Sequence, residues 1–127
     1  TVLDQFCLLP LAVGQESAPD VAEVLELLWG GPETLIVVSS DLSHYLPYQT
    51  ACAVDAQTCE GILALDSDIE PDRACGAFPL NGLLLAARHH HLQPVLLDLR
   101  NSGDTAGDKA RVVGYSAMAF YENDRIQ

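Results

Sequence analysis

An uncharged, β-branched run at residues 34–38 constrains the fold most, because glycine and proline precede it and a polar loop follows it. Runs of this kind form buried strands in sheets that are covered on both faces. A second apolar run at residues 5–13 is closed by Gly14 and predicts another strand, which Pro10 places at a sheet edge or a bulge. We therefore expect a sheet with two strands of this buried type.

Most of the remaining chain shows helical spacing or short strand patterns. Ser17 and Pro19 form a helix start, and apolar residues then recur from Val21 with the 3.6-residue period until Gly30. The predicted order is β-α-β-α-α-β-β, which indicates an α/β domain with a mixed sheet and flanking helices. The later helices are expected at residues 49–65 and from Pro79, and the later strands at residues 93–99 and 112–121.

Length and charge exclude several classes of protein. The 127 residues suit one domain, and a hydrophobic content of 49% suffices for a core. Subtracting 18 acidic from 6 basic residues gives a net charge of −12, which excludes nucleic-acid partners and anionic membrane surfaces. No apolar run reaches the ~20 residues of a membrane span.

The cysteines indicate a reducing compartment, so we expect a cytoplasmic protein. Their spacing matches neither a disulfide framework nor a zinc motif. We expect three of the four to be inert residues on apolar faces: Cys7, Cys52 and Cys59.

Polar residues gather where the strand at residues 34–38 is predicted to end. Ligands of open α/β sheets bind at the carboxyl ends of strands, and Ser40, Asp41 and His44 follow such an end. Asp41 lies three residues before His44, so its carboxylate can orient the imidazole. The alternative is a hydrogen-bonded turn, in which Ser and Asp are common.

Cys75 is the second candidate, because it precedes Gly76 at the start of a predicted helix. Helix N-termini favour the thiolate, which is the form that binds metals and attacks electrophiles. Against this, most cysteines outside disulfides are small packing residues. The residues alone leave both interpretations open.

Three segments resemble motifs of one family. Residues 37–45 resemble the SSD-x-x-H segment of Memo-like proteins, also called AmmeMemoRadiSam system protein B. Residues 74–80 resemble that family's CG-x-x-P-[IL] segment, and residues 101–117 resemble its SGD…VGY stretch. The segments occur in the family's order, and nothing here resembles the family's N-terminal half. The resemblance implies that residues 1–127 form a single domain, the C-terminal part of a Memo-like protein.

The resemblance also implies a fold similar to the class III extradiol dioxygenases, the LigB-like group, with a pocket at the strand ends. His44 matches the histidine that is catalytic in the dioxygenases, and Cys75 matches the family's metal-ligating cysteine. Asp41 and Ser40 would support them. Two further histidines would come from the N-terminal half, and the implied cofactor is non-haem iron or copper.

Two functions follow as hypotheses. The first is a non-haem metal-dependent enzyme, similar to extradiol dioxygenases, whose site is completed by N-terminal residues. The second is a non-catalytic binding or scaffold module that keeps the fold and the pocket. In either case we expect a small-molecule ligand or a peptide as partner. The apolar run at residues 5–13 also predicts a homo-oligomer, because such a strand needs a neighbour.

Overall fold

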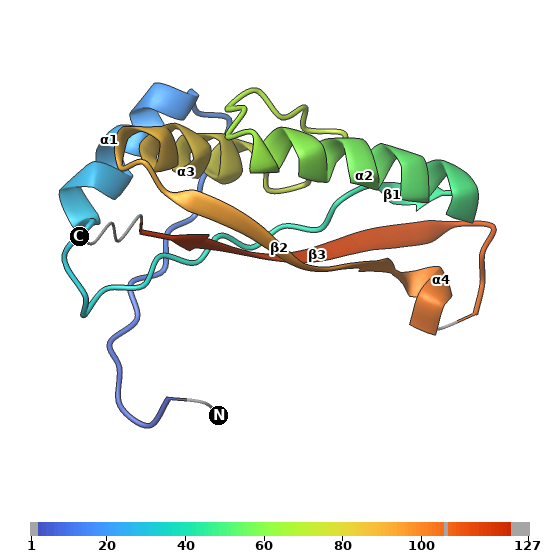
Figure 1. Ribbon diagram of the computed structural model, residues 1–127, viewed down its shortest axis with the longest axis horizontal. Coiled ribbons are helices and arrows are strands. Elements are labelled where there is room, and N and C mark those ends of the chain that lie inside the picture. Colours follow the sequence, from blue (N-terminus) through green and yellow to red (C-terminus); the bar gives the residue numbers. More distant parts are fainter. Residues whose placement is uncertain (1–2, 106, 123–127) are drawn as a thin grey trace.

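The computed structural model describes residues 3–105 and 107–122, and it confirms an α/β domain. Three longer helices lie on one side of a three-stranded sheet, whose order is β1-β3-β2 (Figure 1). The elements, in chain order, are α1 (Ala18–Leu28), β1 (His44–Leu46), α2 (Tyr48–Leu63), α3 (Ala77–His89), β2 (Gln93–Asn101), α4 (Ser102–Thr105) and β3 (Val112–Tyr121).

The sheet is built around one long hairpin. β2 pairs with β3 from Gln93 opposite Tyr121 to Asn101 opposite Gly114, and the single turn of α4 lies in the connection. β1 adds to the other side of β3, with His44 opposite Val113. Both pairings are antiparallel, so the described strands form no mixed sheet. For β2 and β3 the reason is their short connection, since parallel strands need a much longer crossover.

Two apolar clusters hold the helices on the sheet. Ile62 of α2 packs with Leu80 and Leu84 of α3. Val21 and Leu25 of α1 pack with Leu83 of α3. The end of α3 is also tied to α1, because the ring of His90 stacks on Trp29 at a centroid distance of 4.0 Å. His90 Nε2 also lies 2.6 Å from Oε1 of Glu26.

The prediction of a buried strand at residues 34–38 is wrong. The segment is extended, but its backbone makes no ladder with a neighbouring strand in the described chain. Side chains alternate along it: Ile36 and Val38 pack against the core, whereas Leu35 is 80% and Val37 75% exposed. A strand is defined by its partner, and β-branched composition alone does not supply one.

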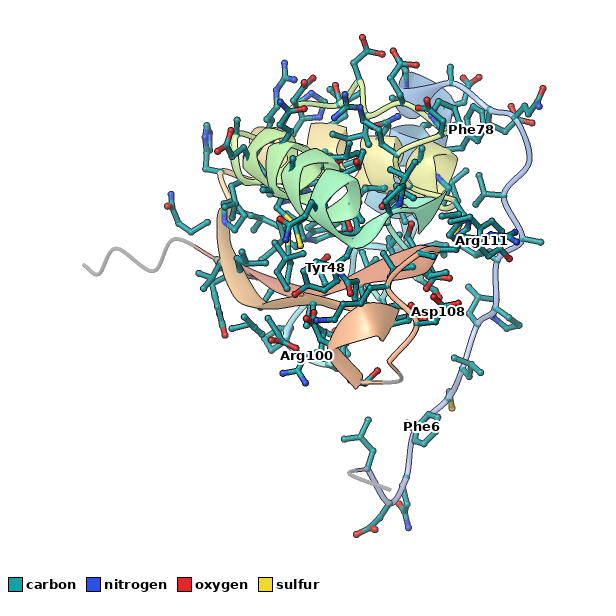
Figure 2. The ribbon with its side chains drawn as sticks, turned by 90° about the vertical axis from the view of Figure 1, so that its right-hand side faces the viewer. Phe6, Tyr48, Phe78, Arg100, Asp108 and Arg111 are labelled. Carbon is teal, nitrogen blue, oxygen red and sulfur yellow. The ribbon has the colours of Figure 1, made fainter. Side chains whose placement is uncertain are left out.

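The predicted strand at residues 5–13 is also absent. Most of this segment runs outside the body of the protein, and Figure 2 shows Phe6 far from the helices and the sheet, whereas Val13 at its end packs against the cluster of α1 and α3. Phe6 is 61% and Leu8 77% exposed. The segment is apolar, but no described strand lies beside it to pair with it.

The other expected elements are confirmed with small shifts of their ends. Ser17 caps α1, since its Oγ accepts a 3.2 Å hydrogen bond from the Asp20 N–H. α3 begins two residues before Pro79. β1 lies in the segment that we expected to be a polar loop, and the short helix α4 lies between the two later strands. Across the described residues, no helix has the length and hydropathy that crossing a membrane requires.

Candidate functional site

Two loops that are far apart in the sequence meet at the start of α3. One loop leads into β1 and carries Ser40 and Asp41, and the other carries Cys75 and Gly76. The Cys75 N–H donates to the Asp41 carbonyl at 3.3 Å, and the Gly76 N–H donates to Ser40 Oγ at 2.9 Å. These hydrogen bonds fix the two loops against each other, so the side chains of the two loops lie close together.

Gly76 lets the loops approach this closely. A Cβ at this position would lie 2.6 Å from the carbonyl oxygen of Ser39 and 2.8 Å from Cβ of Ser40, closer than side-chain carbons approach. The Ser40 hydroxyl also donates to the Asp41 carbonyl at 2.6 Å. Ser40 is therefore a structural link between the loops, and Gly76 makes that link sterically possible.

The structure brings Asp41, His44 and Cys75 together. One donor atom from each lies within 4.8 Å of the others. Nε2 of His44 lies 3.6 Å from Oδ2 of Asp41, and the Asp41 N–H donates to Cys75 Sγ at 3.2 Å. The proximity expected from the sequence is thus present.

The donor set suits a transition metal. A thiolate, an imidazole and a carboxylate together match the preferences of borderline ions such as Fe²⁺, Cu²⁺ and Zn²⁺. The side chains of His44 and Asp41 are 41% and 47% exposed, and Cys75 is exposed. Three protein donors on an open surface leave coordination positions for water, substrate or further protein ligands.

The backbone next to His44 has an unusual conformation. The next residue, Tyr45, has a φ of +63°, a left-handed conformation that is rare for a bulky side chain. The pairing of β1 with β3 shifts register between His44 and Leu46. Arg111 lies over the Tyr45 ring at 5.2 Å from its centroid. Strained backbone and register shifts recur at functional sites, where they aim a side chain.

Asp55, which carries no motif in the sequence, lies beneath this loop. Asp55 is only 2% exposed, and its Oδ1 accepts a 3.0 Å hydrogen bond from the Ser43 N–H. The signal was present, because Asp55 lies four residues from both Ala51 and Cys59 on the buried face of α2. A carboxylate on a core-facing position is the kind of residue that needs a functional explanation.

Two cysteine predictions are wrong, since Cys7 and Cys52 are exposed. Cys7 lies on the segment outside the core, and Cys52 lies on α2, where its sulfur accepts a 3.7 Å hydrogen bond from the Asn101 side chain. Cys59 is buried as expected. Burial raises the pKa of the Cys59 thiol, and the charge of Asp55 adds to the effect. Cys59 is therefore a protonated packing residue.

A second polar cluster lies where the connection between β2 and β3 meets the start of α2. The hydroxyl of Tyr48 donates to Oδ1 of Asp104 at 2.5 Å, and the Asn101 N–H donates to Oδ2 of the same carboxylate at 2.8 Å. This bond raises the pKa of Tyr48 to about 12 and lowers the pKa of Asp104. These residues join the start of α2 to α4, and Figure 2 shows Tyr48 at this end.

Comparison with known proteins places these residues in a family. The family model for "Memo-like protein" matches residues 1–119. A MEMO1 family protein of Sulfurisphaera tokodaii is 34% identical over 95 residues, which cover 69% of this chain and 34% of the relative. Relatives of the same name in Methanosarcina mazei and Sulfolobus acidocaldarius are 32% and 33% identical over 89% and 91% of the chain.

The chain spans about half the length of most of these curated relatives, since it covers 47% of the Methanosarcina mazei protein and 45% of the Sulfolobus acidocaldarius protein. The matched region contains all the residues that approach one another at the candidate site, from Ser40 to Cys75. The chain belongs to the Memo-like protein family.

Proposed function

We propose that this chain carries part of a transition-metal site in a non-haem metal-dependent enzyme, similar in chemistry to the extradiol dioxygenases. The observation that carries the proposal is the approach of Asp41, His44 and Cys75, whose donor atoms lie within 4.8 Å of one another. Iron or copper fits this donor set. When bound, the metal would supply Lewis-acid or redox chemistry.

Each side chain has a separate role in the proposal. Cys75 is the metal ligand, and its sulfur is oriented by the Asp41 N–H at 3.2 Å. His44 is the acid/base, since its partly exposed imidazole is free to reach a substrate, and a ring nitrogen within 4.8 Å of the Cys75 sulfur would also help to hold the same ion. The Asp41 carboxylate, 3.6 Å from Nε2, orients that ring. Ser40 supports the site by joining the two loops.

A neighbouring cavity supports a small-molecule substrate. It has a volume of about 580 Å³ and extends between the segment at residues 34–38 and β3. Ser40 and Leu42 line one part of it, and Met118 and Phe120 line another, so an apolar space reaches the loop that carries Asp41. A partly apolar molecule placed there would reach Ser40, whose hydroxyl oxygen lies 3.9 Å from the Cys75 sulfur. The remaining metal ligands would come from residues outside this chain.

A binding or scaffold module is the second candidate, and exposed apolar residues favour it. Leu35 and Val37 project from an unpaired extended segment, and residues 34–40 and 5–13 contain no charged side chain. A second copy is the partner we propose, because two such segments can meet without the repulsion that a net charge of −12 imposes elsewhere. We further propose the cytoplasm as compartment, since all four cysteines are free.

Metal analysis separates the two candidates. The protein is loaded anaerobically with Fe²⁺ or Cu⁺, desalted and assayed for metal per chain. The metalloenzyme proposal expects a ratio near one that Cys75→Ser abolishes and the control Cys7→Ser retains, because Cys7 is exposed but remote. Equal retention by wild type and Cys75→Ser, or none by either, would favour the binding module.

A further inference from the structure

Asp55 is a buried carboxylate that the proposed chemistry does not use. It lies on the core face of α2 and is 2% exposed. Among the described residues it takes part in no ion pair. A carboxylate leaves water at a high free-energy cost unless hydrogen bonds replace its hydration. An apolar residue would fill this position without that cost, so packing alone does not explain Asp55.

The hydrogen bond of Asp55 reaches the residue before His44. The Ser43 N–H donates to Oδ1 of Asp55 at 3.0 Å, and Ser43 is itself 1% exposed. β3 holds the same stretch from another direction: the Gly114 N–H donates to the Ser43 carbonyl at 2.9 Å. The backbone that enters β1 is thus fixed by α2 and β3 together.

Gly114 makes room for the carboxylate. A Cβ on Gly114 would lie 2.6 Å from Cγ and 3.0 Å from Oδ1 of Asp55, which no side-chain carbon tolerates without movement. The carboxylate therefore fills the space that the missing side chain of β3 leaves. Asp55, Gly114 and Ser43 form one fitted junction between helix, strand and loop.

We propose that Asp55 is a positioning residue for His44. By accepting the Ser43 N–H, it fixes the backbone where β1 begins and so sets how the imidazole faces Asp41 and Cys75. The support matters because Tyr45, on the other side of His44, holds a left-handed φ of +63°.

His44 and Cys75 are held in place by separate sets of hydrogen bonds. Cys75 is fixed by bonds to the Asp41 main chain and lies next to Gly76, which is bonded to Ser40, and none of these bonds involves Asp55. Loss of the Asp55 bond should therefore displace the imidazole and leave the thiolate in place. This inference rests on the proposed metal site, in which His44 and Cys75 act on the same ion.

Cobalt titration tests the proposal, with Co²⁺ alone as the probe. The thiolate-to-cobalt charge-transfer band reports Cys75, and the visible ligand-field bands report the rest of the coordination. Asp55→Leu should keep the charge-transfer band, change the ligand-field bands and weaken Co²⁺ binding by about tenfold or more, as losses of orienting partners do. In a His44→Ala background the same substitution should have no further effect, since its target is gone.

Matched variants separate positioning from general damage. Asp55→Asn keeps an oxygen that accepts the Ser43 N–H, so it should bind Co²⁺ within about twofold of wild type. Thr58→Val alters another buried polar residue of α2, whose hydroxyl bonds only to the Val54 carbonyl among the described residues. Ser43→Ala removes a buried hydroxyl that has no hydrogen-bond partner in the described chain and keeps the N–H. Thr58→Val and Ser43→Ala should both bind Co²⁺ with the affinity and the spectrum of wild type.

Wild-type affinity and spectrum in folded Asp55→Leu would overturn the proposal, as would an equal loss in Thr58→Val or Ser43→Ala. If Asp55→Leu does not fold, Gly114→Ala replaces it, because the added methyl group displaces the carboxylate. If wild type gives no charge-transfer band, the proposed metal site fails, and positioning is read from the imidazole NMR signals of His44. Signals that move in Asp55→Leu but not in Ser43→Ala support it, and signals unchanged in both overturn it.

Discussion

The Asp41 N–H donates a 3.2 Å hydrogen bond to the sulfur of Cys75, across 34 residues of sequence. This bond joins the loop before β1 to the start of α3, and it places a thiol beside a carboxylate and an imidazole. The site is therefore assembled by main-chain contacts, which set its geometry before any ligand binds. It follows that changes to the two loops should affect the chemistry of Cys75 directly.

Bound metal should protect Cys75 from alkylation and leave the other exposed cysteines unprotected. Cys7, Cys52 and Cys75 are all exposed, so all three should react with iodoacetamide in the metal-free protein. Cys59 should react slowest, because burial raises the pKa of its thiol and blocks the reagent. Peptide mass spectrometry with and without Co²⁺ measures the four rates. Equal protection of Cys7 would show that the effect is not local to the site.

Ser40→Ala should destabilise the fold and loosen the site. It removes the acceptor for the Gly76 N–H and the bond to the Asp41 carbonyl, in a partly buried place. We expect a loss of about 1–2 kcal/mol in the free energy of unfolding, measured by urea denaturation, together with weaker metal binding. Ser39→Ala is the control, because Ser39 is exposed and its side chain makes no hydrogen bond within the described residues. An unchanged midpoint for Ser40→Ala would contradict the linking role.

The sequence predicted those helices and strands whose capping residue or pairing strand lies nearby in the chain. α1 follows from the Ser17 cap, and β2 and β3 follow because they pair with each other across a short connection. The segment at residues 34–38 has equally strong strand composition and forms no strand. Strand formation depends on a neighbour, and composition does not show whether one is present.

Only part of the candidate site could be predicted from the sequence, because local sequence does not show long-range contacts. His44 is the first residue of β1 and Cys75 lies two residues before α3, so both lie at the ends of loops, which commonly carry functional side chains and which local sequence indicates. Asp55 acts from inside a helix through the main chain of Ser43. Helical spacing from Ala51 and Cys59 indicates that Asp55 is buried, but its contact with Ser43 spans 12 residues and involves no motif, so only the packing of α2 on the loop reveals that contact.

Tyr48 should ionise at a higher pH than an ordinary tyrosine, and its ionisation should destabilise the fold. Its bond to Asp104 raises its pKa to about 12 from 10.0, so the protonated phenol is favoured in the folded state. The stabilisation is full below about pH 10 and is lost as the pH rises through about 12. The contribution of Asp104 to stability depends on pH in the opposite direction. The pKa of Asp104 is lowered from 3.8, so its stabilisation of the fold is present above that value and is lost in acid.

Phenolate absorbance checks this prediction. The difference between titrations of wild type and Tyr48→Phe isolates Tyr48 from the other three tyrosines. Asp104→Asn should move the midpoint of Tyr48 back toward 10.0, because the charged acceptor is gone. A Tyr48 midpoint near 10.0 in wild type would show that the bond to Asp104 does not form in solution.

Leu35 should lie in a contact between two copies of the chain. It is 80% exposed on an extended, uncharged segment, and Leu27 of α1 is equally exposed at 80%. Leu35→Lys should raise the dimer dissociation constant by about tenfold or more, the expected effect of removing one buried leucine and adding a charge. Leu27→Lys should leave it unchanged, since exposure alone does not make an interface. Sedimentation equilibrium of the three proteins measures the constants, and a wild-type chain that stays monomeric at high concentration would refute the contact.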